Sequence, residues 1–122
     1  MTPSEGLVHA LVEDFSELRP LLTEHLTDNE GELLPYLLMS DVARWAIREV
    51  EHNPSRVAEL MRWLDARFAA ADEVVETLIA VGFVEMLPAT PAGDPLLELL
   101  APELRQVAQE MNLFEPWGDQ PG

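Results

Sequence analysis

The 122-residue sequence contains no cysteine and no lysine. The absence of cysteine excludes disulfide bonds and thiolate chemistry, and with them the usual framework of a small secreted domain. No apolar run approaches the ~20 residues of a membrane-spanning helix. The first residues, MTPSEGLVHALVEDF, lack the basic segment of a signal peptide. We therefore expect a soluble, cytoplasmic protein that does not insert into a membrane.

Positive charge is scarce: seven arginines face 23 acidic residues, and the net charge is −16. Residues 1–40 have a net charge of −7, residues 41–67 are neutral and residues 68–122 have a net charge of −9. Such a surface repels nucleic acid and anionic lipid and speeds the encounter with a basic protein. The alternative interpretation is that the charge provides solubility and nothing more.

The length and pattern of the sequence predict an all-α fold. A chain of 122 residues matches one ordinary domain, and its 48% hydrophobic content is enough for a core without disulfides or metal. No segment alternates apolar and polar residues with the period of a strand. We expect a compact single-domain bundle of six or seven helices over residues 1–114, followed by a flexible C-terminal tail at 115–122.

Serine is also scarce, and each serine stands where a helix N-cap is expected. The pattern predicts helices that start at Ser4, Ser16, Ser40 and the Asn53-Pro54-Ser55 break. Leu33–Met39 is expected to form a buried connector before Ser40, with a helix that begins after Pro35 as the alternative. Asp72 should cap a central helix from Glu73 to Leu87. Pro95 and Pro102 suit the first turns of two further helices, 95–100 and 102–113.

Residue groups with the spacing of a reactive site are missing from the sequence. The histidines, His9, His25 and His52, are far apart, so a metal site would need distant residues to converge. No nucleophile elbow and no glycine-rich phosphate loop occurs. We expect no catalytic residue, no metal, no cofactor and no enzymatic activity.

Glu85 stands out on the predicted helix 73–87. At 100° per residue it falls among Val74, Leu78 and Val81, and away from the polar stripe of that helix. This position predicts a buried structural acid paired with an arginine or with backbone amides. A role facing a partner or a ligand is the alternative.

Two tryptophans project away from the apolar arcs of their helices. Trp45 is predicted beside Arg48 and Glu49, and Trp63 beside Arg56 and Arg67. Because Trp and Arg dominate binding hot spots, the two rings could belong to a docking surface rimmed by acids. Otherwise a second layer of helices covers them. The candidate partner-binding residues are Glu30, Glu32, Trp45, Arg48, Trp63, Asp72, Glu73 and Glu76.

Two segments, LLPYLLMSDV at 33–42 and LIAVGFVEMLP at 78–88, resemble an uncharacterised family of small, acidic bacterial helical proteins. Members of that family are often encoded beside polymorphic toxins. The resemblance implies an immunity-like or antitoxin-like role and brings no catalytic residue with it. Glu85 and the Leu-Leu-Pro segment carry over as structural signatures.

The sequence thus favours a protein that binds and occludes a basic toxin or effector domain by charge complementarity. The alternative is a regulatory or scaffolding module that binds another bacterial protein, for instance through Phe114, Pro116 and Trp117.

Overall fold

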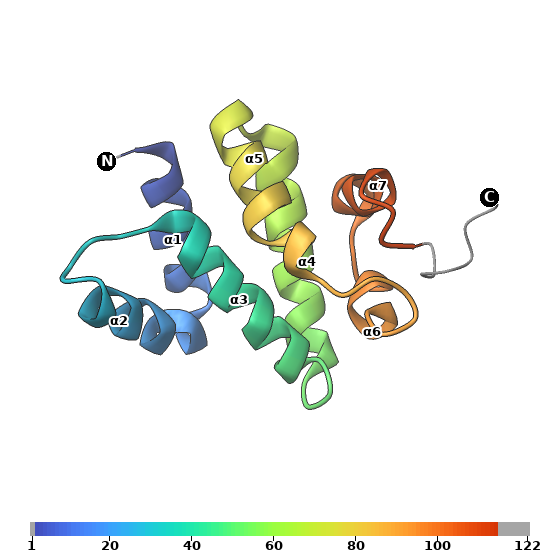
Figure 1. Cartoon of the computed structure of the whole chain (residues 1–122), viewed down its shortest axis with the longest axis horizontal. Coiled ribbons are helices and arrows are strands. Elements are labelled where there is room, and N and C mark those ends of the chain that lie inside the picture. Colours follow the sequence, from blue (N-terminus) through green and yellow to red (C-terminus); the bar gives the residue numbers. More distant parts are fainter. Residues whose placement is uncertain (1, 115–122) are drawn as a thin grey trace.

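The structure, a computed structural model, describes residues 2–114. Over these residues it is entirely helical, with seven α-helices and two short 3-10 helices and no strand, as the sequence predicts (Figure 1). In chain order these are α1 (Pro3–Asp14), η1 (Ser16–Leu18), α2 (Arg19–Asp28), α3 (Pro35–Glu49), α4 (Pro54–Ala70), α5 (Glu73–Gly82), η2 (Val84–Met86), α6 (Asp94–Leu97) and α7 (Pro102–Glu110).

Helix α5 is the central helix, as its apolar sequence predicts. It packs against α1, α3 and α4, and Figure 1 shows α3 and α5 side by side with α4 behind α5. Leu78 and Ile79 on α5 and the following Phe83 are fully buried. They belong to one continuous core that reaches from α1 to α7, so residues 2–114 share a single hydrophobic interior. None of the described helices is both long and apolar enough to cross a membrane.

Gly82 allows α3 and α5 to approach closely. A Cβ atom at this position would lie 3.1 Å from Cβ of Met39 and 3.6 Å from a ring carbon of Tyr36. The N-terminal turns of α3 therefore pack against the C-terminal end of α5. The segments 33–42 and 78–88, which are far apart in sequence, therefore meet in the fold.

The prediction that serines cap the helices is wrong at all four positions. Thr2 caps α1 in a capping box with Glu5, and Asn53 caps α4 through a hydrogen bond from Arg56 N. In both helices a proline follows the cap as the first helical residue, and the serine comes after the proline. Proline suits that position because its missing N–H is not needed there. The side chain of Ser16 caps nothing, since Phe15 precedes η1 without a side-chain hydrogen bond.

Helix α3 likewise begins at Pro35 and not at Ser40. Ser40 lies inside the helix, where its hydroxyl donates a hydrogen bond to the carbonyl of Tyr36 at 3.0 Å. The segment 33–39 is thus helical from Pro35 onward, in agreement with the alternative for this connector, and Tyr36 and Leu37 on its first turn are exposed.

Three other helix starts are confirmed. Asp72 caps α5 by accepting a hydrogen bond from Val75 N at 3.1 Å, and Pro95 and Pro102 lie in the first turns of α6 and α7. Helix α5 is shorter than predicted, because it ends at Gly82 and the chain continues as the 3-10 turn η2.

Candidate functional site

Trp63 joins the middle of α4 to the end of α1. Its indole N–H donates to a carboxylate oxygen of Asp14 at 2.6 Å, and its ring meets Phe15 edge-on at 6.2 Å between centroids. The guanidinium of Arg67 lies over the indole, 4.6 Å from the ring centroid. The ring is half-buried and its polar group is already paired. Trp63 therefore has a clear structural role, which neither of the two sequence-based interpretations specified.

Arg56 makes a second connection between α4 and the α1–η1 corner. Its guanidinium donates to both carboxylate oxygens of Glu17 at 2.7 and 2.9 Å, to Glu59 at 2.7 Å and to the carbonyl of Asp14 at 3.0 Å. It also lies over Phe15, 4.1 Å from the ring centroid. The hydrogen bonds from Arg56 lower the pKa of Glu17, and those to Glu17 and Glu59 raise the pKa of Arg56. The contact with Glu17 could not be predicted from the sequence, because Glu17 is 39 residues away from Arg56 in the chain.

Trp45 is half-buried on α3, where it packs against the core. No hydrogen bond from its indole N–H to another residue occurs within residues 2–114, and no buried side-chain nitrogen there is left without a partner. The indole N–H of Trp45 is therefore open to solvent. Trp45 and Trp63 stand on different helices and have different surroundings.

Glu85 is exposed, so the prediction of a buried acid is wrong. It lies in η2, beyond the end of α5, and no ion pair or hydrogen bond involves its side chain among the described residues. Val74 and Val81, which suggested a buried arc, are themselves 54% and 40% exposed. Apolar side chains therefore occupy part of the exposed side of α5 as well as its buried side. Glu85 comes after this exposed part in the chain.

A polar cleft of about 400 Å³ lies between α2 and α3. Its lining combines three carboxylates, two arginines and a buried histidine: Leu21, Glu24, His25, Asp28, Asn29, Leu37, Asp41, Arg44 and Arg48. Arg44 pairs with Asp41 within the cleft. Of the candidate partner-binding residues, Arg48 lines this cleft, while Glu30 and Glu32 are exposed in the turn that joins α2 to α3.

His25 forms part of the cleft wall and is 3% exposed. Its Nε2 accepts a hydrogen bond from the backbone N–H of Leu34 at 2.9 Å, and its own carbonyl accepts one from the Asn29 side chain at 2.8 Å. Nε2 can accept only when it carries no proton, which places the proton of a neutral ring on Nδ1. His25 thus holds the end of the α2–α3 turn against α2.

The remaining candidate acids lie at the start of α5. Asp72 and Glu73 are exposed and Glu76 is partly buried, and the carboxylate of Asp72 is occupied by its cap. These acids come from the α4–α5 turn, and Glu30 and Glu32 from the α2–α3 turn. Figure 1 shows the two turns at separate places on the molecule.

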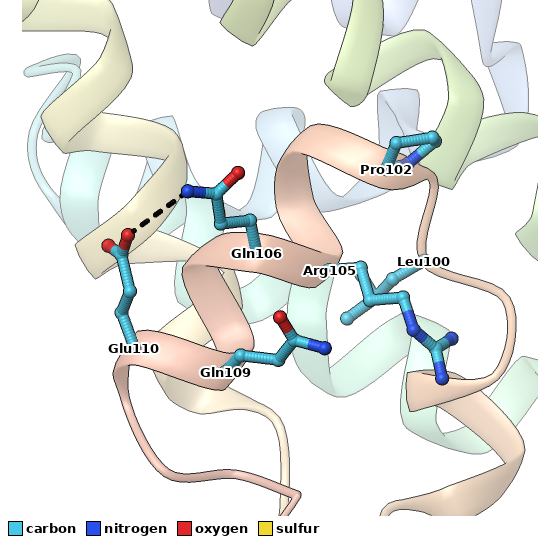
Figure 2. Close-up of a pocket in the computed structure, with 6 residues that line it drawn as sticks. All are labelled: Leu100, Pro102, Arg105, Gln106, Gln109 and Glu110. Atoms are coloured by element: carbon cyan, nitrogen blue, oxygen red, sulfur yellow. Dashed lines mark hydrogen bonds between the residues drawn. The ribbon is translucent and has the colours of Figure 1, made fainter.

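A shallow depression of about 630 Å³ runs along α7 and is lined by Leu100, Pro102, Arg105, Gln106, Gln109 and Glu110. Figure 2 shows Gln106 and Glu110 turned toward each other, joined by a 3.5 Å hydrogen bond, with Arg105 on the opposite side of the helix. The guanidinium of Arg105 lies 4.9 Å from the ring of Phe114. The polar groups do not converge on one point, so the depression has no obvious ligand.

Within residues 2–114, no three His, Asp or Glu side chains stand close enough together to hold a metal ion. His25 is engaged by the backbone, and His9 and His52 lie exposed on other elements. Phe114, from the alternative docking segment, is partly buried, and Pro116 and Trp117 fall in the predicted tail at 115–122, outside the described residues.

Comparison with known proteins identifies a family and no characterised relative. No curated protein and no solved structure matches the chain. The sequence profile of one family, described as a domain of unknown function (DUF7674), matches residues 8–115, which is 108 of the 122 residues. The match covers α1 from residue 8 onward and all of the helices from α2 to α7. The chain therefore belongs to the DUF7674 family.

Proposed function

We propose that the protein acts in the cytoplasm as an immunity-like inhibitor that binds a basic toxin or effector domain and covers its working surface. The observation that carries the proposal is a large excess of unpaired carboxylates. Residues 2–114 contain 21 acidic residues, three of which, Glu17, Asp41 and Glu59, form ion pairs, so 18 have no ion-pair partner there.

Arginines that the sequence offered as part of a docking patch make contacts within the chain instead. Arg56 is bound to two carboxylates and a carbonyl, and Arg67 lies over Trp63. These contacts stabilise the fold and leave the acidic residues to determine the outer electrostatic field. A field of one sign raises the rate at which an oppositely charged protein is encountered and disfavours nucleic acid.

The family resemblance suggests which basic protein to test. Because relatives of the resembled family are often encoded beside toxins, the product of the adjacent gene is the candidate partner. The two proteins should be co-expressed and the complex sought by size-exclusion chromatography with light scattering. We expect a stable complex at low salt and loss of the partner's toxicity in cells that express both proteins.

A variant with Glu30→Gln, Glu32→Gln, Glu73→Gln and Glu76→Gln tests whether these acids contribute to recognition of the partner. These side chains make no ion pair among residues 2–114, so the variant should fold normally. A complex that forms equally well with this variant, or a partner that carries no basic surface, would favour the scaffolding alternative. Absence of any complex would reject the adjacent-gene product as partner and with it this proposal.

A further inference from the structure

The exposed side of α5 carries large apolar side chains that no other part of residues 2–114 covers. Val74 and Val81 are two turns apart on the same side of the helix and are 54% and 40% exposed. Tyr36, whose ring touches the position of Gly82, is 45% exposed, and Met86 in the adjoining η2 is 43% exposed. We call these four residues, Tyr36, Val74, Val81 and Met86, the apolar α5 face.

The segment that carries most of this face has charge of one sign. Residues 72–86, which contribute Val74, Val81 and Met86, contain four acidic residues and no basic one. Glu73 precedes Val74 directly, and Glu85 follows Val81 by four residues and is exposed. Of the arginines near these residues in sequence, Arg44 lines the α2–α3 cleft, and Arg67 lies over the ring of Trp63 and lines a pocket with Val75.

We infer that the apolar α5 face is the docking site for a basic amphipathic helix of the partner, whose apolar side packs on Val74, Val81 and Tyr36 while its Lys or Arg side chains meet Glu73 and Glu85. The inference rests on the proposed function, in which the partner is basic, and adds the place and the form of contact. A helix fits because ridges of side chains four residues apart pack into the grooves of another helix.

The charge argues against a second copy of the same chain as the occupant. Two copies joined through this face would bring two sets of four acidic residues together, with no basic residue of segment 72–86 between them. A basic helix supplies the missing charge and covers the apolar area in the same contact. Acids would then set the association rate, and the apolar side chains the lifetime of the complex.

The test uses the whole protein and a fluorescein-labelled peptide of about 18 residues, with leucine at helical i, i+3, i+4 and i+7 positions and lysine elsewhere. Fluorescence anisotropy should show binding that weakens as salt rises. The Val74→Ser/Val81→Ser variant should bind at least about tenfold more weakly, because both side chains lie in the contact. The matched control is Leu37→Ser, an exposed apolar residue that faces the α2–α3 cleft; it should change the affinity by less than about twofold.

The contribution of charge is tested by comparing two double variants, one at the apolar α5 face and one in the α2–α3 cleft. Glu73→Gln/Glu85→Gln should weaken binding of the lysine peptide more than Glu24→Gln/Asp28→Asn, which lie in the α2–α3 cleft. A peptide with glutamate in place of lysine should not bind. Equal weakening by the two pairs would show diffuse charge attraction and overturn the assignment of the site, and so would failure of the lysine peptide to bind.

Sedimentation velocity tests whether a second copy of the protein occupies the apolar α5 face. A dimer of the natural protein that Val74→Ser/Val81→Ser dissociates would make a second copy the occupant and overturn the inference. A natural basic partner that binds this variant as tightly as the unaltered protein would also overturn it, while leaving the proposed function intact. Circular dichroism of each variant confirms that the fold is retained.

Discussion

The indole N–H of Trp63 donates to Asp14 at 2.6 Å, and this hydrogen bond ties α4 to the end of α1 across 49 residues of sequence. Trp63→Phe keeps an aromatic ring for Phe15 and Arg67 but removes the donor. We expect it to lower the free energy of unfolding by about 1–2 kcal/mol, the usual effect of losing a hydrogen bond to a charged group near the surface. Urea denaturation measures this change.

The control for Trp63→Phe is Asp14→Asn, which keeps a side-chain oxygen to accept the indole hydrogen bond. It should cost less than Trp63→Phe. If both variants are as stable as the natural protein, the contact contributes nothing to stability and Trp63 is available for another role.

The Glu17–Arg56 pair should make stability depend on pH in the acid range. Hydrogen bonding to Arg56 lowers the pKa of Glu17 in the folded protein below its ordinary 4.5. Its contribution is therefore fully present above the ordinary pKa and is lost as the pH falls through the lowered value. Because the pair is partly exposed, we expect about 1 kcal/mol or less. The stability difference between the natural protein and Glu17→Gln should shrink below about pH 4, and a difference independent of pH would contradict this account.

His25 holds the α2–α3 turn through the backbone N–H of Leu34. His25→Ala leaves that N–H without its acceptor and opens a cavity at a buried position, so we expect a loss of about 2–4 kcal/mol. Amide hydrogen exchange at Leu34 should accelerate more than exchange in α7. Unchanged protection at Leu34 would show that the hydrogen bond is not what orders the turn.

Gly93 is required for space and not for an unusual backbone angle. A Cβ atom there would lie 1.8 Å from the carbonyl oxygen of Pro88, a clash with backbone that a side-chain rotation cannot relieve. Gly93→Ala should cost more than about 2 kcal/mol in thermal or urea unfolding. Ala92→Ser, at the exposed neighbouring position, is the control and should change stability by less than about 0.5 kcal/mol. Equal stability of the two variants would contradict the close approach.

The helical class of the fold and its central helix could be predicted from the sequence because both depend on local periodicity and on apolar content. The starts of α5, α6 and α7 were also correct, since an aspartate cap and two prolines act within a single turn. The serine caps failed because Thr2, Asn53 and the prolines after them compete for the same helix starts. A local pattern alone does not decide which of two neighbouring capping residues is used.

Contacts between residues far apart in the sequence could not be predicted from local sequence patterns. The orientation of α5 is determined by α1, α3 and α4, so a helical wheel could not show that Val74 and Val81 face solvent and that Glu85 follows them. The pairing of Arg56 with Glu17 similarly depends on how α4 packs against η1. Glu30 and Glu32 are exposed in the α2–α3 turn and Glu73 is exposed at the start of α5, since turns and helix starts at the surface are rarely buried.

The most direct test of the central claim is the association rate with the adjacent-gene product, measured by stopped flow at low and high salt. For the natural protein, the account predicts fast association at low salt and a steep fall as salt screens the unpaired acids. The variant with glutamine at positions 30, 32, 73 and 76 should associate about tenfold more slowly at low salt and approach the natural protein at high salt. Equal rates for the two proteins at every salt concentration would contradict recognition by charge.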